Sequence, residues 1–162
     1  MRETAKNIPK DVKELLDLSL SENEEIICSF SGDIDENGNF GEVWLFLTTK
    51  RIITINPVTK NVRQINLNDV RSSFVKDYLG NSELLLETND GLKSVIRFSR
   101  ERLEGFYNLA KLIDKIAKGD IKLESVNPEI FETLLSEKSG TKKTQALLWL
   151  MGFLKPYITM LF

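Results

Sequence analysis

The sequence predicts a mainly β domain of class α+β, in which seven short strands form an antiparallel barrel or sandwich and one helix covers its open end. Short runs rich in Ile, Val, Leu and Phe recur between residues 25 and 98, and turn residues separate them. A single amphipathic segment with helical periodicity follows. Hydrophobic residues make up 41% and charged residues 28% of the chain, which is typical of a globular domain.

The elements are predicted in order along the chain. A helix is expected over residues 9–20, because Pro9 suits a first turn and the apolar residues that follow it recur near one face. Strands are expected at residues 25–31, 42–48, 51–55, 62–67, 73–79, 83–88 and 92–98. Two of the connections between strands carry strong turn signals, at residues 32–39 and at residues 89–91.

The helix after the last strand is expected to begin with Ser99 as its N-cap and to stop at Gly119. Its apolar stripe consists of Leu103, Phe106, Ala110 and Ile113. This stripe is expected to pack on the inner faces of the strands. The predicted domain therefore spans residues 21–119, after a helical extension over residues 1–20.

Strand alternation predicts which side chains enter the core. Trp44, Phe46 and Phe98 are expected to be core or half-buried strand residues, and Leu92 and Ile96 are expected to face the same way as Phe98. In the strand at residues 73–79, Phe74, Lys76 and Tyr78 share one face and Val75 takes the other. Cys28 is interpreted as a small buried hydrophobe rather than a nucleophile, because no histidine or second cysteine exists to activate it.

Composition excludes several classes of function. The net charge of −2 gives no basic face of the kind that nucleic-acid binding requires. Histidine is absent and no catalytic constellation is apparent, so no catalytic residue, metal or other cofactor is predicted. A single cysteine and an N-terminus without an apolar h-region indicate a reducing, cytoplasmic location.

The segment Asp33-x-Asp35-x-Asn37-Gly38 copies the beginning of a calcium-binding loop. In such a loop the twelfth position would be Trp44, where a bidentate glutamate is needed, and helices would have to flank it. Since Asp, Asn and Gly also form turns, a plain turn is the preferred interpretation.

The C-terminal part changes in character. Residues 120–144 are predicted to be a linker with one short helix, and residues 145–162 are apolar and aromatic. Tryptophan and tyrosine favour a bilayer interface, lysines favour the anionic headgroups, and a proline breaks the helix where the chain turns into the membrane. The predicted membrane-interface residues are Lys142, Lys143, Trp149, Phe153, Lys155, Pro156 and Tyr157. The alternative is that this segment is a buried C-terminal helix of the soluble domain.

The run Leu47-Thr48-Thr49-Lys50-Arg51 resembles a hairpin pattern of bacterial pleckstrin-homology-like domains, whose fold is seven strands and a C-terminal helix. Residues 33–44 resemble a domain that precedes the membrane domain of some bacterial ABC exporters, and residues 147–157 are similar to the elbow helix of those proteins. The resemblance implies a non-catalytic regulatory or interaction domain on the cytoplasmic side of the cell membrane. Residues 145–162 would then lie on the inner leaflet and continue into a first transmembrane helix beyond Phe162, in a full-length transport ATPase.

The partners that this resemblance implies are the transporter core or a sister subunit, with a homo-oligomer as a further option. Phosphoinositide binding is not expected, because the first hairpin loop carries Asp33, Asp35 and Glu36 and no basic residue. Four basic residues on neighbouring strands and turns are interpreted as a solvated edge rather than a binding patch: Lys50, Arg51, Lys60 and Arg63.

Two rival functions remain open. The chain could be a stand-alone peripheral membrane adaptor whose tail is an interfacial anchor. It could also be an enzyme or ligand-binding barrel, but that function needs a polar pocket, and the strand faces offer mainly Val, Ile, Leu and Phe.

Overall fold

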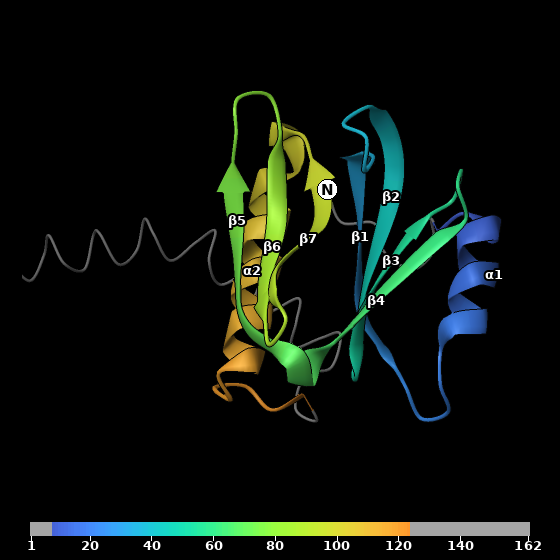
Figure 1. The fold of residues 1–162 in the computed structure, drawn as a ribbon. Helices are drawn as coiled ribbons and strands as arrows, with labels where there is room; N and C mark the ends of the chain where they lie inside the picture. Colours follow the sequence, from blue (N-terminus) through green and yellow to red (C-terminus); the bar gives the residue numbers. More distant parts are fainter. Residues whose placement is uncertain (1–7, 124–162) are drawn as a thin grey trace, which may run out of the picture. The chain divides into compact units, whose positions relative to one another are not determined.

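The computed structural model describes residues 8–123, which form one seven-stranded antiparallel sheet and two α-helices (Figure 1). The order of strands in the sheet is β4-β3-β2-β1-β7-β6-β5. The elements are α1 (Lys10–Ser19), β1 (Ile26–Ile34), β2 (Phe40–Thr48), β3 (Arg51–Asn56), β4 (Asn61–Asn66), the 3₁₀ turn η2 (Leu67–Asp69), β5 (Val70–Asp77), β6 (Ser82–Thr88), β7 (Gly91–Phe98), the 3₁₀ turn η3 (Arg100–Arg102) and α2 (Leu103–Ala117). The predicted class and element order are therefore confirmed.

The sheet consists of two halves, β1–β4 and β5–β7, that meet where β1 crosses β7 (Figure 1). Ile34 of β1 lies opposite Arg97 of β7 at this crossing. A Cβ atom on Gly32 would lie 2.6 Å from the carbonyl oxygen of Arg97, so only glycine allows the two backbones to come this close. Residues 32–34 were predicted to be part of a turn. That prediction was wrong, because this close approach keeps them in β1.

Helix α2 closes the domain through aromatic packing. Phe106 stacks on Phe98 with ring centroids 4.0 Å apart and also contacts Phe30 at 5.5 Å. Gly119 ends the helix as predicted, with a φ of +77° that favours glycine. Ser99 occupies the predicted N-cap position, at the start of the 3₁₀ turn η3 that leads into α2, but its side chain makes no capping hydrogen bond.

Strand β7 contains an irregularity that inverts the predicted facing of one residue. Leu84 of β6 lies opposite Ile96, but the next residue, Leu85, lies opposite Ser94. Val95 is therefore an extra residue, and the alternation changes phase at this bulge. Ile96 and Phe98 are buried as predicted, whereas Leu92 is 60% exposed.

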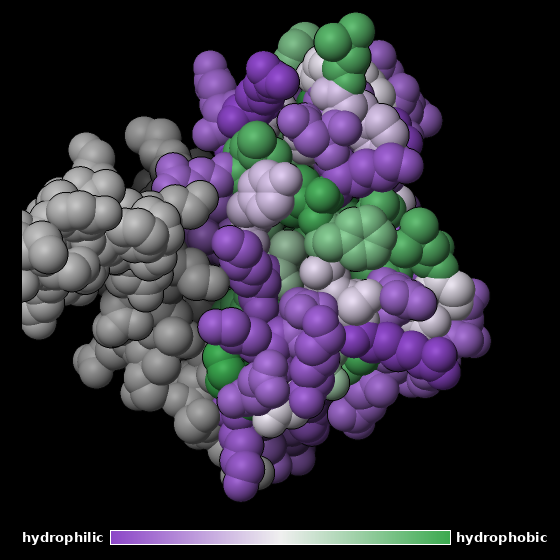
Figure 2. Space-filling view, turned by 90° about the vertical axis from the view of Figure 1, so that its left-hand side faces the viewer, coloured by the Kyte–Doolittle hydropathy of each residue, from purple (hydrophilic) through white to green (hydrophobic). Residues whose placement is uncertain are grey.

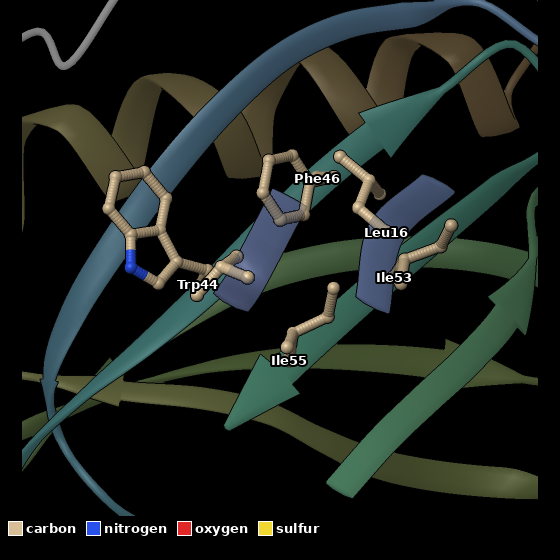
Figure 3. Close-up of a cluster of buried hydrophobic side chains, with 6 residues drawn as sticks. Leu16, Trp44, Phe46, Ile53 and Ile55 are labelled. Atoms are coloured by element: carbon tan, nitrogen blue, oxygen red, sulfur yellow. The ribbon is translucent and has the colours of Figure 1, made fainter. Parts of the chain in front are cut away.

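Strands β2 and β3 are buried on both faces. Ile52 and Thr54 line a small cleft that faces Val95 of the other half, so Ile53 and Ile55 point away from the domain interior. Helix α1 covers that outward side with Val12 and Leu16 (Figures 1 and 3). We call the four residues beneath it the outer β2–β3 face: Trp44, Phe46, Ile53 and Ile55.

Candidate functional site

The predicted membrane-interface residues, Lys142, Lys143, Trp149, Phe153, Lys155, Pro156 and Tyr157, lie outside the described residues. The linker after residue 123 lies outside them as well. No helix within residues 8–123 is long and apolar enough to cross a membrane. The candidate sites described below therefore all lie within residues 8–123.

The turn between β1 and β2 is built by Asp35. Its carboxylate accepts hydrogen bonds from the backbone N–H groups of Asn37 and Asn39, both at 2.9 Å, and Gly38 adopts a φ of +83°. The turn interpretation is confirmed. Within residues 8–123 there is no group of three or more Cys, Asp or Glu side chains arranged to hold a metal ion.

Arg51 and Glu24 form an ion pair that ties the α1–β1 connection to the β2–β3 hairpin. The Arg51 guanidinium donates to both carboxylate oxygens of Glu24, at 2.5 and 3.0 Å, and to the carbonyl oxygen of Ser19 at 2.7 Å. Thr48 donates its hydroxyl to the same carboxylate at 2.6 Å. We call this arrangement the Glu24–Arg51 clasp.

The prediction of a solvated basic edge was wrong for Arg51, because its side chain is only 15% exposed. Sequence reasoning missed its partner, Glu24, whose side chain is fully buried in the fold. The hydrogen bonds from Arg51 lower the pKa of Glu24 to about 2, more than burial raises it, and the carboxylate in turn raises the pKa of Arg51. The clasp therefore stays ionised at neutral pH, and its groups are engaged inside the fold.

Other charged residues serve the fold in a similar way. Arg63 donates to the carbonyl oxygen of Ser94 at 2.9 Å. Asp33 accepts from the backbone N–H of Ser99 at 2.7 Å, and although burial opposes its ionisation, hydrogen bonds from Ser99 and the charge of Arg102 lower its pKa. Of the four predicted basic-edge residues, Lys50, Lys60 and Arg63 are exposed, as predicted.

Strand β5 is an edge strand that carries exposed aromatic and apolar side chains. Phe74 of β5 and Tyr78, which directly follows the strand, are each 41% exposed, and Leu79 in the following turn is fully exposed. The ammonium group of Lys76 lies 5.1 Å from the centre of the Tyr78 ring. We call these four residues the β5 surface. Figure 2 views the side of the molecule on which β5 lies and shows apolar groups among polar ones there.

The carboxylate of Glu83 holds Tyr78 of the β5 surface in place through a hydrogen bond. Glu83, only 7% exposed, accepts a hydrogen bond from the Tyr78 hydroxyl at 3.2 Å and another from Ser94. Its carboxylate lies 3.7 Å from the side chain of Arg97. These contacts orient Tyr78. The predicted facing of Phe74, Lys76 and Tyr78 is confirmed, but their exposure was not predicted.

A small cleft opens between the two halves of the sheet. Its volume is about 10 Å³, which is room for about one water molecule. It is lined by Ile52, Thr54, Arg63, Ile65 and Val95. This cleft is too small for a metabolite, so it does not provide the polar pocket that the enzyme alternative requires.

The chain matches the model of a family described as a bacterial PH domain over residues 20–111, which is more than half of its length. No curated protein matches the chain. The matched segment contains all the strands and the first part of α2, whereas α1 precedes it. The seven-stranded sheet with its C-terminal helix agrees with this match.

Proposed function

Because the chain belongs to the bacterial PH domain family, we propose that its β domain is a non-catalytic interaction domain that binds a partner protein through the β5 surface. The observation that carries this proposal is the exposure of Phe74 on an edge strand and of Tyr78 and Leu79 directly after it. Aromatic residues are enriched at protein interfaces and dominate their binding energy.

A lipid headgroup is a weaker candidate for the ligand. Headgroup recognition needs convergent cations, but the β1–β2 turn is acidic and Arg51 and Arg63 form hydrogen bonds within the fold. Lys76 is the basic residue of the β5 surface, and it lies against the ring of Tyr78. This chemistry favours a partner surface that combines apolar side chains with a carboxylate opposite Lys76.

We propose further that the domain works on the cytoplasmic side of the cell membrane, as the front end of an ABC-type exporter. The support is the resemblance of residues 145–162 to an elbow helix on the inner leaflet. The domain would dock the transporter core or a sister subunit and bias assembly or gating. ATP hydrolysis would belong to another part of that protein. The alternative is a stand-alone peripheral adaptor.

The β5 surface is tested by the triple variant Phe74→Ser, Tyr78→Ser and Leu79→Ser. We expect the native complex to lose its partner in native gel electrophoresis of detergent extracts. The matched control is Phe40→Ser with Val58→Ser, which also removes exposed apolar side chains, at 91% and 85% exposure, but away from β5. Both variants should keep the wild-type circular dichroism spectrum. A complex that survives in the triple variant contradicts the proposal.

The proposal that the domain is part of an ABC-type exporter is tested separately. The native gene product is immunoblotted with an antibody against residues 20–120. A band several times larger than 18.5 kDa in the integral-membrane fraction would support an exporter. A band near 18.5 kDa that carbonate releases from membranes would contradict it and favour the peripheral adaptor. Deletion of residues 1–140 should impair assembly, location or transport, and a deletion without effect would refute the docking role.

A further inference from the structure

The outer β2–β3 face contains a buried hydrogen-bond donor that finds no acceptor among residues 8–123. Trp44 is 1% exposed, and no described residue accepts a hydrogen bond from its indole N–H. In Figure 3 the indole nitrogen points away from Phe46, on which the Trp44 ring stacks with centroids 6.1 Å apart. A buried donor without an acceptor is energetically unfavourable. Helix α1 covers the apolar side chains of this face but offers no acceptor to the indole N–H of Trp44.

Helix α1 is lightly held on this face. It has ten residues, and no side chain caps its N-terminus, because Pro9 at the N-cap has no polar side-chain group. Val12 and Leu16 are its fully buried residues, and Ile8, Leu15 and Leu20 are partly buried against the same cluster. Leu18, by contrast, is 84% exposed. Helices of this length are marginal in isolation, so α1 depends on its docking contacts. At its C-terminal end it is retained by the hydrogen bond from Arg51 to the carbonyl oxygen of Ser19.

We propose that the outer β2–β3 face is a docking surface for an amphipathic helix of a partner protein, and that α1 occupies this surface in the free chain. The incoming helix presents apolar residues with the i, i+4 spacing of Val12 and Leu16. It also presents a carboxylate or amide oxygen that accepts the indole N–H of Trp44. Satisfying this donor gives the partner an advantage that α1 lacks, and α1 is displaced.

This surface is distinct from the β5 surface. The face residues belong to β2 and β3, inside the segment that matches the bacterial PH domain, whereas α1 precedes that segment. The helix therefore lies outside the matched segment and the face that it covers lies inside it. The inference stands whether or not the β5 surface binds a partner.

Hydrogen exchange of the full chain, followed by mass spectrometry, tests whether α1 opens on its own. We expect the amides of residues 10–19 to exchange at least ~10-fold faster than those of β2 and β3 while the sheet stays folded. Exchange of α1 and of these strands at one common rate would mean that α1 leaves only when the domain unfolds. That result would overturn the proposal.

Labelled peptides of residues 8–20, measured by fluorescence anisotropy against the full chain, test helix docking. One peptide has the native sequence, and two carry an acceptor at a partly buried position, as Ile8→Gln or Leu15→Gln. Each is measured with the wild-type protein and with Trp44→Phe. For each acceptor peptide, we compare its affinity with that of the native peptide on the same protein. For at least one acceptor peptide, this affinity ratio should be about threefold to tenfold larger on the wild-type protein than on Trp44→Phe.

Two outcomes would overturn the proposal. The first is the absence of peptide binding, or the same relative affinities with Trp44 and with phenylalanine. The second is a concentration-dependent dimer in analytical ultracentrifugation that native α1 peptide dissociates, because the occupant of the face would then be a second copy of this chain. Faster exchange of α1 in the presence of an acceptor peptide, without a change in β5–β7, would support it.

Discussion

Replacement of Glu24 by glutamine probes the clasp that holds the α1–β1 connection to the β2–β3 hairpin. The change keeps the size of the side chain and one acceptor oxygen, but it removes the negative charge. The side chain of Glu24 is fully buried and that of Arg51 is only 15% exposed. Water can therefore replace little of the ion pair that the substitution removes. Removal of one partner from a buried pair leaves the other charge uncompensated.

The magnitude follows from the pKa of Glu24, which falls from an ordinary 4.5 to about 2 in the folded protein. At 1.36 kcal/mol for each pH unit, this difference of about 2.5 corresponds to about 3 kcal/mol of folding stability. The folded-state pKa is the lower one, so the stabilisation is fully present above pH 4.5. It is lost as the pH falls toward about 2.

Urea unfolding followed by circular dichroism, at several pH values between 2 and 7, measures this effect. Glu24→Gln should be about 3 kcal/mol less stable than the wild type at pH 7, and the difference should shrink toward zero near pH 2. Glu42→Gln, at an exposed position on β2, is the matched control and should change stability little. A difference for Glu24→Gln that is small at pH 7, or constant with pH, would refute the reasoning.

Three further predictions concern packing, close approach and reactivity. Leu16→Ala should lower the free energy of unfolding, measured in urea, by about 2–5 kcal/mol, because it removes a buried side chain of α1. Leu18→Ala, on the exposed side of the same helix, should change this free energy little. Equal effects of the two variants would contradict the packing of α1. Gly32→Ala should destabilise the domain by about 1–3 kcal/mol in thermal unfolding, because the added Cβ would lie 2.6 Å from a carbonyl oxygen of β7. Gly41→Ala is the control for the same measurement, since its added Cβ would have its nearest contact at 3.5 Å. Cys28 is half-buried, and desolvation of its thiol raises the pKa of that group. Alkylation at pH 8 should therefore be slower in the folded protein than in urea, and equal rates in both would contradict this.

Much of the fold could be predicted because the period of apolar residues reports local structure. The helix α1, every strand and most of the apolar stripe of α2 follow from that period. In that stripe Phe106, Ala110 and Ile113 are buried as predicted and Leu103 is half-buried, while Leu109 and Leu112 are buried without having been predicted. The failures occurred where a distant segment overrides a local signal. Gly32 is a turn residue by type, yet the crossing of β1 over β7 holds it in a strand. The bulge at Val95 inverts the facing of Leu92 without a mark in the local pattern.

The candidate sites were less predictable than the fold. The shared face of Phe74, Lys76 and Tyr78 follows from alternation, but their exposure depends on β5 being an edge strand. Continuous apolar runs such as residues 43–47 are typical of strands buried on both faces, and this signal could have indicated a cover for β2 and β3. The identity of that cover, α1, is not encoded in the run itself.

The sequence by itself determined the type and order of the elements and identified Trp44, Phe46 and Phe98 as residues removed from solvent, because apolar side chains in strand-like runs are buried. Only the tertiary structure decided which faces meet. It brought Glu24 to Arg51 across 27 positions and α1 onto the outer β2–β3 face. Contacts of this kind depend on how the whole sheet bends and closes, and a local pattern carries no record of the partner that it will bury.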